Sequence, residues 1–595
     1  MAQQIGIGKL VDPYWKARFK YAKYLKKAPL EEKAVLFESQ HGEEFNGTVF
    51  YILKYMAHSE EYKGFKFYLA AVSERIEDFK DKLREYKIKG VTVVDTKDEH
   101  YFKALASCKY LVNDDTFLSF FIKREGQVYL NTWHGTPLKT LGCKVKADAY
   151  NIGNEQKNFI CADYLLFQND YAKDMICRDY FLENLARGKA VVAGYPRNTI
   201  FFDPERAEEV RRKLAPNGEK IYAYMPTHRG GTSAGSTAKA TAFFVYYLYE
   251  LDEKLEDGEI LYTKIHPVAQ NDISFEDFKH IKPFPARLET YDVLNACDLL
   301  VTDYSSVVFD YICTKKKVVL YVYDREEYLK DRGTYMPLEE LPFPQVCTTE
   351  ELVKELRSGK EYNDDALREK FCPFDNPEAS KKLMDRVVLK KETGLKLEDI
   401  PDNGKENVFL YAGNLAANGM TASLRTLLKN LDNEKRNYYI SFWTEAAAVN
   451  KDILATFKGQ TGYFGTLGDM TLTWWQGVLR KLFKDKYIKA GLYMFFMKKV
   501  FRNNFLRQFG GARIDRLVQF TGYEAETILA YSAFKGHTSI FVHNDMLGEI
   551  KLKGNQRKDV LKYAYRHYNK VAVVTDDILP PTRKLAGRRA NIVRV

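Results

Sequence analysis

The stretch Val-Thr-Asp-Tyr-Ser-Ser-Val-Val-Phe-Asp at residues 301–310 joins an apolar run to a turn rich in hydroxyl groups, and a second apolar run follows. The first run predicts a buried strand and the second a helix, so backbone N–H groups and hydroxyls converge at the turn, where they can bind an anion. We therefore expect Thr302, Ser305 and Ser306 to contact phosphate. Asp303 would repel phosphate, so we assign it to capping or loop orientation. The alternative is a simple N-cap cluster.

Four more polar motifs lie upstream, each directly after an apolar run. They are Asn-Thr-Trp-His-Gly-Thr-Pro-Leu-Lys at 131–139, Gly-Tyr-Pro-Arg-Asn at 194–198, Pro-Thr-His-Arg at 226–229 and Lys-Ile-His-Pro at 264–267. Polar loops after apolar strands are where ligands of open α/β sheets bind. The motifs are thus candidates for one shared site.

Strands and helices alternate along the first two thirds of the chain. Strand patterns fall near 35–39, 67–72, 90–94, 110–112 and 128–131, and a second series near 220–225, 260–265, 299–302 and 318–322. This alternation predicts parallel sheets with helices on both faces. Two such units in tandem predict the GT-B arrangement of two Rossmann-like domains with a cleft between them.

A third unit begins after a polar, charged stretch. A strand at 408–411 leads into a Gly- and Asn-containing loop that opens a helix, and further strand patterns fall near 517–521, 539–543 and 570–575. We predict an N-terminal helical, basic segment (1–29), an acceptor-side Rossmann-like domain (30–198), a donor domain (199–390), a linker (391–405) and a third Rossmann-like α/β domain (406–595).

Composition limits the class of protein. The chain has 595 residues, 45% hydrophobic and 29% charged, which describes a folded, multidomain protein. The eight cysteines contain no CxxC pair, so they predict reduced thiols in the cytoplasm and no metal site. No segment reads as a signal peptide or a membrane span. Nothing in the sequence calls for a cofactor.

His134 lies at the end of a predicted strand beside a glycine, which lets a substrate approach closely. An imidazole there suits a general base that takes a proton from an acceptor hydroxyl. A histidine bonded within its own turn is the alternative. Lys139, five residues on, is a candidate contact for acceptor or donor phosphates, or else a solvated charge.

The remaining candidates come from the middle of the chain. Pro267 ends a strand because it lacks an N–H donor, which holds His266 at the cleft rim. Arg229, with Thr227 in the same motif, supplies a planar cation that suits phosphate oxygens. Arg197 sits near the expected domain crossing and either serves the same end or forms a structural ion pair.

Taken in order, the motifs of residues 131–139, 194–198, 226–229 and 264–267, upstream of the turn at 301–310, resemble the CDP-glycerol glycerophosphotransferase family, which builds teichoic-acid and related polymers. The resemblance covers roughly residues 30–390. It implies His134 as the catalytic histidine, His266 as a second catalytic group at the donor pyrophosphate, and Lys139, Arg197, Thr227, Arg229, Thr302, Ser305 and Ser306 as substrate-binding residues. Two departures are Thr199 where the family usually has Asp and His228 where it usually has Trp.

The reaction implied is transfer of glycerol phosphate from CDP-glycerol to a polyol-phosphate or lipid-linked hydroxyl, with release of CMP. CDP-ribitol is the nearest alternative donor, because the motifs address pyrophosphate and not the carbon chain. A nucleotide-sugar GT-B glycosyltransferase and an assembly scaffold are further alternatives. Residues 406–595 resemble the acceptor-side half of a second GT-B enzyme, without its donor half, so we do not expect independent sugar transfer.

Residues 474–513 carry ten Lys or Arg against one acid, together with ten aromatic residues. This mixture is typical of a helix lying on anionic lipid, with long cationic stems reaching to the headgroups. An amphipathic helix packed on its own domain is the alternative, and nucleic-acid binding is not expected without a recognition motif. The sequence thus predicts peripheral contact with the inner face of the cell membrane and leaves the oligomeric state open.

Overall fold

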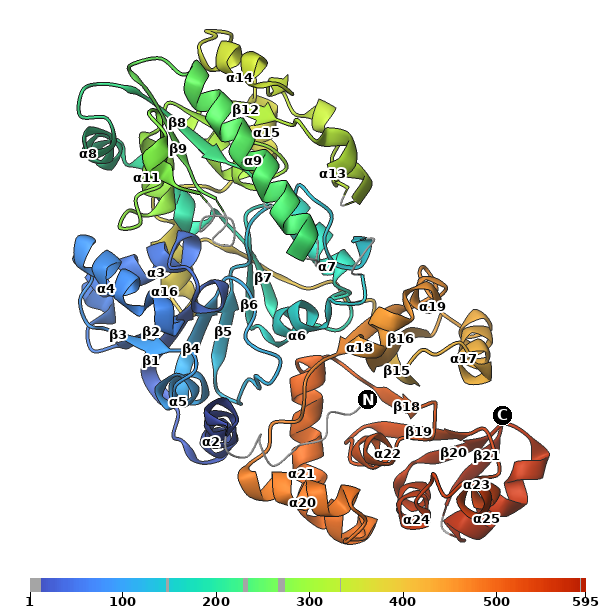
Figure 1. Cartoon of the computed structure of the whole chain (residues 1–595). Helices are drawn as coiled ribbons and strands as arrows, with labels where there is room; N and C mark the ends of the chain where they lie inside the picture. The colour runs from blue at the N-terminus through green and yellow to red at the C-terminus, as the bar shows by residue number, and fades with distance from the viewer. Residues whose placement is uncertain (1–11, 146–148, 228–233, 266–272, 332, 589) are drawn as a thin grey trace.

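The computed structural model describes residues 12–145, 149–227, 234–265, 273–331, 333–588 and 590–595. Three α/β units, each built on its own sheet, make up the molecule (Figure 1). The first two units confirm the expected GT-B-like pair of Rossmann-like domains, and the third confirms a further Rossmann-like domain.

The first sheet has eight strands in the order β14-β7-β6-β5-β4-β1-β2-β3. The strands are β1 (Glu31–Glu38), β2 (Lys66–Ala71), β3 (Val91–Asp95), β4 (Cys108–Asn113), β5 (Val128–Asn131), β6 (Tyr164–Phe167), β7 (Lys189–Val192) and β14 (Lys396–Asp399). All pair in parallel except β14, which runs antiparallel to β7. Part of the segment expected to be a linker therefore completes the edge of this sheet.

Helices cover both faces of the first sheet, because its strands are apolar on both sides. They are α2 (Pro13–Lys27), α3 (Gly47–His58), α4 (Ile76–Glu85), α5 (Glu99–Ser107), α6 (Gly153–Cys161) and α7 (Asp170–Asp179), with a 3₁₀ turn η1 (Gln40–Gly42) after β1. A second 3₁₀ segment, η5 (Pro196–Phe202), leads from this domain into the next.

The second sheet has six parallel strands in the order β10-β9-β8-β11-β12-β13. The strands are β8 (Lys220–Met225), β9 (Glu259–Thr263), β10 (Ile281–Pro283), β11 (Leu299–Thr302), β12 (Lys317–Tyr321) and β13 (Gln345–Val346). The helices are α8 (Pro204–Leu214), α9 (Ala234–Lys254), α11 (Thr290–Ala296), α12 (Val307–Tyr311), α13 (Arg325–Asp331), α14 (Thr349–Leu356), α15 (Asp365–Phe371) and α16 (Ala379–Val387).

Helix α16 ends the second unit but packs on the first. Its Leu383 and Met384 belong to the same buried cluster as Val49 and Leu53 of α3. Its Asp385 accepts hydrogen bonds from Tyr55 (3.1 Å) and Tyr62 (3.0 Å). The chain therefore crosses back after the second domain and fastens the two units to each other.

The third sheet has seven parallel strands in the order β17-β16-β15-β18-β19-β20-β21. The strands are β15 (Glu406–Gly413), β16 (Arg436–Trp443), β17 (Gly462–Thr466), β18 (Arg516–Gln519), β19 (His537–Val542), β20 (Lys570–Val573) and β21 (Ile592–Arg594). The helices are α17 (Gly419–Lys429), α18 (Thr444–Val449), α19 (Lys451–Ala455), α20 (Trp474–Lys484), α21 (Ala490–Phe509), α22 (Ala525–Tyr531), α23 (Met546–Leu552), α24 (Lys558–His567) and α25 (Leu579–Ala586).

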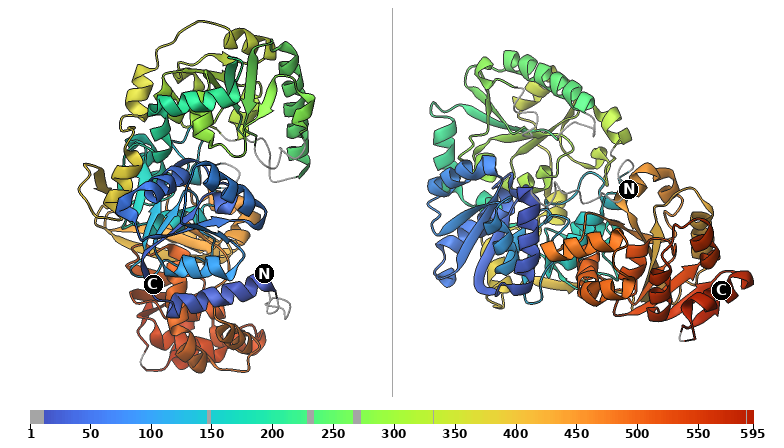
Figure 2. Two further views of the ribbon diagram at one scale, coloured as in Figure 1. Left: turned by 90° about the vertical axis from the view of Figure 1, so that its left-hand side faces the viewer. Right: turned by 60° about the horizontal axis from the view of Figure 1, so that its bottom comes forward.

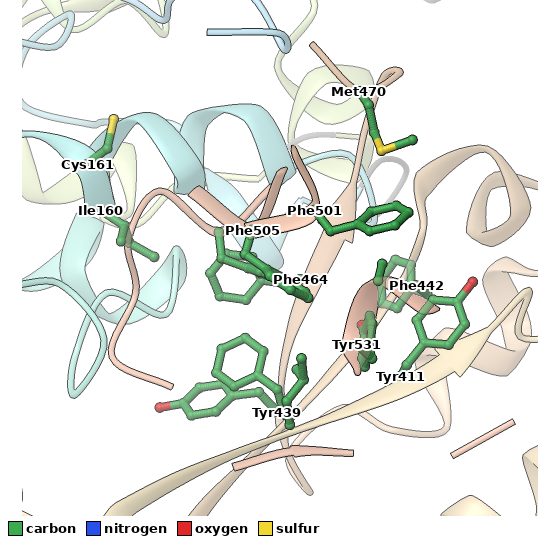
Figure 3. Close-up of a cluster of buried hydrophobic side chains, with 14 of the residues drawn as sticks. Ile160, Cys161, Tyr411, Tyr439, Phe442, Phe464, Met470, Phe501, Phe505 and Tyr531 are labelled. Atoms are coloured by element: carbon green, nitrogen blue, oxygen red, sulfur yellow. The ribbon is translucent and has the colours of Figure 1, made fainter. Parts of the chain in front are cut away.

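The third domain shares its core with the first. Ile160 and Cys161 of α6 lie in one continuous buried cluster with Phe464 of β17 and Phe505 of α21, as Figure 3 shows. The approach is close: a Cβ added to Gly153 at the start of α6 would lie 1.8 Å from the carbonyl oxygen of Gly465. The sequence predicted a third domain after a linker, and the structure joins that domain to the first through apolar packing.

Candidate active site

The candidate site lies at the carboxyl ends of three adjacent strands of the first sheet, β1, β4 and β5. Each of these strands ends in a polar loop: η1 after β1, Asp114 and Asp115 after β4, and His134 after β5. Because parallel strands present their carboxyl ends at one edge, loops far apart in sequence meet there.

His134 is held by two polar neighbours. Its Nδ1 lies 3.0 Å from Nε2 of Gln40, and its Nε2 lies 3.7 Å from Oδ1 of Asp115. The orientation of the Gln40 amide determines the tautomer of His134. If the amide nitrogen donates to Nδ1, the ring proton is on Nε2. If the amide is turned by half a turn, its oxygen accepts from Nδ1–H and Nε2 is free to accept a proton. Asp115 also lies 3.3 Å from Nε2 of His41.

The ring of His134 rests on Trp133, with ring centroids 4.1 Å apart. Trp133 is buried against Phe159 and has a positive φ of 49°, so the loop is fixed in a conformation that few L residues adopt. The His134 side chain itself remains 38% exposed. It is therefore anchored on one side and open to a substrate on the other.

The surroundings of His134 favour its neutral form, chiefly through loss of hydration. Loss of hydration lowers the pKa of His134; Asp115 opposes this shift, and Lys139 and Arg197 add to it. A lowered pKa leaves the imidazole unprotonated at neutral pH, which is the form that accepts a proton.

Arg197 links the histidine loop to the second domain. It is buried, its Nη1 donates to the carbonyl oxygen of His134 (2.9 Å), and its Nη2 pairs with Asp310 of α12 (2.9 Å). Its guanidinium lies 4.4 Å from the ring centroid of Tyr195. The structure thus places this predicted phosphate ligand behind the histidine, in contact with backbone and carboxylate.

The hydroxyl-rich turn follows β11, at the carboxyl edge of the second sheet. Thr302 is buried and donates to the carbonyl oxygen of Met225 (2.7 Å). Asp303 accepts from both the backbone N–H (2.9 Å) and the hydroxyl (2.6 Å) of Thr227, so it orients the loop after β8. Thr302 and Thr227 are thereby brought together by the strand pairing of β8 with β11.

Ser305 and Ser306 are partly exposed at the start of α12. A Cβ added to Gly135 would lie 3.7 Å from the hydroxyl oxygen of Ser306, so this turn faces the histidine loop across the domain boundary. The Ser306 side chain makes no capping hydrogen bond to α12. Its hydroxyl is therefore available to a ligand beside His134.

Lys139 lies on the same loop as His134, at the boundary between the first and second domains. Its backbone bridges to Thr334, and the neighbouring Leu138 accepts a hydrogen bond from the N–H of Tyr335 (2.8 Å). The loop after β5 is thus hydrogen-bonded to the second domain on both sides of Lys139.

Two other expected site residues, Arg229 and His266, lie outside the described residues. Lys264, in the same motif as His266, forms an ion pair with Glu44 of the first domain (3.0 Å).

Three residues near His134 were not singled out from the sequence: Gln40, His41 and Asp115. The sequence could have indicated them, since each lies in a polar loop that follows an apolar strand.

Two buried carboxyls lie beneath these three residues. Burial raises the pKa of Glu38 to about 8, and burial raises the pKa of Asp114 to about 7. Glu38 accepts a hydrogen bond from Tyr101 (2.6 Å) and Asp114 accepts one from Ser39 (2.7 Å).

One group of possible metal ligands occurs among the described residues. Cys313, Cys372 and Asp375 bring three ligand atoms within 4.8 Å of one another. All three residues already take part in hydrogen bonds. Asp375 accepts from Cys313 (3.3 Å) and from Gln168 (2.8 Å), and Cys372 donates to the carbonyl oxygen of Phe309 (3.0 Å). Asp375 also accepts from the N–H of Tyr195 (2.9 Å), so the group forms a polar network close to Arg197 in sequence and space.

The fold and this site match one known class of enzyme. The family described as CDP-Glycerol:Poly(glycerophosphate) glycerophosphotransferase matches residues 20–389, so the chain belongs to this family. The matched span holds the first two domains and leaves the third outside it.

Similar proteins fall in the same class. A teichoic acid poly(glycerol phosphate) polymerase of Bacillus spizizenii is 26% identical over 392 residues, covering 60% of this chain and 93% of the relative. Another from Staphylococcus epidermidis is 27% identical over 385 residues, 60% of this chain, and here the match spans only 51% of the relative. The solved wall teichoic acid polymerase TagF is 26% identical with a TM-score of 0.53, covering 64% of this chain and 94% of that structure.

Proposed function

We propose that this chain transfers glycerol phosphate from CDP-glycerol to a hydroxyl of a polyol-phosphate or lipid-linked acceptor, releasing CMP. Family membership and the glycerol phosphate polymerases among its relatives support the reaction class. The observation that carries the proposal for this chain is the position of His134, open on one side and facing the hydroxyl turn of the second domain.

In the proposed reaction, an acceptor hydroxyl oxygen attacks the phosphorus that carries glycerol. The bond from that phosphorus to the bridging oxygen breaks, and CMP leaves with the electron pair. With the Gln40 amide turned so that its oxygen accepts a hydrogen bond from Nδ1–H, the hydroxyl proton passes to Nε2 of His134. The N–H groups and hydroxyls of Ser305 and Ser306 would stabilise charge on the donor phosphates, with Thr227 beside them.

The other candidates, apart from Thr302, also have proposed roles. Arg197 would position the His134 loop through its carbonyl bond, and Asp115 with Gln40 would orient the ring. Lys139 lies close enough to His134 to lower its pKa and would meet acceptor or donor phosphate. Arg229 and His266 keep the donor-binding roles that the family resemblance implies.

The direct test is CMP release by the purified chain from CDP-glycerol and, separately, from CDP-ribitol, with a lipid-primer analogue as acceptor. The His134→Asn variant should lose about 10²–10⁴-fold in rate, as expected for a lost general base. The matched control is His100→Asn, an exposed histidine on α5. Turnover of CDP-ribitol alone would show that the donor is CDP-ribitol and not CDP-glycerol. Full activity of His134→Asn would show that His134 is not the general base.

We further propose that α20 and α21 hold the protein against anionic lipid at the inner face of the membrane. Trp475 (74% exposed) and Phe495 (80% exposed) project into solvent, and Leu492 and Phe496 share the exposed face of α21. Lysines flank them, including Lys481, Lys486 and Lys498. Such a mixture of aromatic and basic side chains suits an interface of headgroups.

Part of this segment packs on the protein itself, which was the alternative expectation for it. Tyr493, Phe501, Phe505 and Phe509 face inward, so α21 also packs on its own domain and on α6. Figure 2 shows α20 and α21, in orange, along the side of the third domain that faces the first. No helix among the described residues is both long enough and apolar enough to cross a bilayer. The eight free cysteines fit a reducing compartment.

Vesicle co-sedimentation tests this docking. Replacing both aromatics, Trp475→Glu with Phe495→Glu, should weaken binding to phosphatidylglycerol vesicles by about tenfold or more, because two large side chains lose their apolar contact. The control is Leu552→Glu, an equally exposed apolar side chain on α23. Unchanged recovery of the double variant would remove this surface from membrane binding.

A further inference from the structure

The third domain has a cavity at the point where its strand order reverses. The order β17-β16-β15-β18-β19 turns between β15 and β18, and in open parallel sheets ligands bind outside the carboxyl ends at that point. The cavity of about 60 Å³ lies beside that point. It is lined by Tyr411 of β15, Trp443 of β16, Thr466 of β17 and residues of α22, the helix that follows β18.

Two carboxylates line this cavity, and one arginine satisfies both. Arg480 donates to Asp469 (2.8 Å) and, through Nε and Nη2, to Glu526 (2.8 Å each). Tyr493 also donates to Glu526 (2.8 Å). The acidic groups of the cavity are thus already neutralised within the domain.

Arg507 is a second cation on the same wall, and it forms no ion pair among the described residues. The nearby Asp469 favours its charged form but is already bonded to Arg480. Only 1% of it is exposed, and it donates to Asn504 Oδ1 (2.7 Å) and to the backbone carbonyls of Ser119 (3.2 Å) and Leu467. Its Nη2 is buried without a hydrogen-bond partner among the described residues. Burial, together with the smaller effect of Arg18, lowers the pKa of Arg507 to about 9, so the group is still a cation at neutral pH.

A buried cation without a counter-charge is costly, and such groups are normally paired with an anion. Arg507 also ties the third domain to the first through Ser119, which accounts for its Nη1 but leaves Nη2 and the cavity unexplained. Arg18 adds a further positive charge at this wall through its bond to the Asp469 carbonyl (3.0 Å). The local excess of charge is therefore positive.

The other walls are aromatic. Tyr411, Phe501 and Tyr531 border the cavity, and Figure 3 shows them close to one another around the same buried cluster. Ring faces of this kind contact the C–H groups of a sugar or polyol, whereas a planar guanidinium matches phosphate oxygens. The size of the cavity limits the ligand to a small molecule or to the end of a longer one.

We propose that this cavity is a second ligand site, in which Arg507 binds the phosphate of a small polyol or sugar phosphate monoester and the aromatic wall holds its carbon chain. The site belongs to the domain outside the family match and does not depend on the transfer reaction proposed above. Filling it would supply the anion that Arg507 lacks.

The test is isothermal titration of the full chain, at low salt, with glycerol 3-phosphate and separately with inorganic phosphate. Ala530→Leu on α22 extends an apolar side chain into the cavity without removing a charge. It should weaken glycerol 3-phosphate binding by about tenfold or more. Arg507→Met should do the same, and Lys498→Met, an exposed cation on the same helix, should leave binding unchanged.

The outcomes are distinct. Saturable ester binding that is lost in Ala530→Leu, with CMP release intact, supports the site even if Arg507→Met does not fold. No binding by the unaltered chain, or equal binding by Ala530→Leu, overturns the site. Inorganic phosphate bound as tightly as the ester overturns the assignment of a polyol or sugar ester. Failure of CMP release affects only the first two domains and leaves this result standing.

Discussion

Arg197 and Asp310 form a buried ion pair, 2.9 Å between Nη2 and Oδ2, that joins the segment entering the second domain to helix α12. Because the same guanidinium also holds the His134 carbonyl, one side chain couples the histidine loop to the hydroxyl turn. The relative position of the two candidate halves of the site thus depends on a contact that no substrate needs to touch.

We expect Asp310→Asn to cost about 3–5 kcal/mol in the free energy of unfolding, because it leaves Arg197 buried without its counter-charge. CMP release should fall as well, since the His134 loop loses its fixed anchor. Urea unfolding measures the first effect. Arg212→Met, on the exposed face of α8, should change stability by no more than about 0.5 kcal/mol. An Asp310→Asn variant as stable as this control would contradict the coupling.

Gly135 follows His134 and lies against the guanidinium of Arg197, so there is no room for a side chain at residue 135. Its φ is +135°, and a Cβ would lie 2.5 Å from Nη2 of Arg197. Gly135→Ala should therefore lower stability by about 1–3 kcal/mol and reduce CMP release, because backbone strain and displacement of Arg197 combine. Gly359→Ala has open space around the added Cβ and is the matched control. Equal activity of the two variants would show that the loop tolerates the shift.

The pH dependence of the reaction tests the environment of His134. Its lowered pKa places the acid limb of kcat/KM below the usual histidine range, with activity rising as pH rises through that pKa. Asp115 favours the imidazolium, so Asp115→Asn should move the acid limb to still lower pH, whatever happens to the plateau. The profile of Asp174→Asn, an exposed carboxylate on α7, should match the unaltered chain. An acid limb moved to higher pH would contradict the assignment.

Glu38 makes a prediction about stability. The pKa of Glu38 is about 8 in the folded chain, whereas an unfolded glutamate ionises near 4.3. The folded state therefore holds a proton that the unfolded state releases, and stability declines as pH rises from about 5 to about 8. Glu38→Gln should flatten that decline in thermal unfolding, since a neutral amide still accepts from Tyr101. Glu32→Gln on the same strand should leave the slope unchanged.

Much of the fold was predictable because its strands are apolar on both faces and end in polar loops. Those patterns predict the boundaries of three strands directly: β5 (128–131), β8 (220–225) and β11 (299–302). The neighbours of His134 did not follow, because Gln40 and Asp115 approach it only through the strand order β5-β4-β1. Strand order depends on long-range packing, which local periodicity does not encode. The same limit hid the pairing of Arg197 with Asp310.

The dual character of α21 was also beyond local reasoning. A helix with apolar side chains on more than one side can pack on its own protein or can face lipid. In α21, Phe501 and Phe505 are buried in the cluster that the first and third domains share, whereas Leu492 and Phe495 are exposed. The partner on each side is a property of the assembled domains. It explains why a segment that reads as a surface helix also fastens the third domain.

That fastening gives the last prediction, at the contact of Gly153 with Gly465. A Cβ at residue 153 would meet the Gly465 carbonyl oxygen at 1.8 Å, so Gly153→Ala must push α6 away from β17. We expect a loss of about 1–3 kcal/mol, as for an overpacked core, and separate unfolding of the third domain in calorimetry.

The control for this prediction is Gly419→Ala at the start of α17, where no atom lies within 4 Å of the added Cβ. Cutting the chain after residue 405 should have a stronger effect, because the apolar side of α6 loses its cover and the remaining domains aggregate. A single unchanged transition in Gly153→Ala, or a well-behaved and active truncated chain, would show that the shared core contributes little. Separate transitions would instead identify the third domain as a structural partner of the catalytic pair.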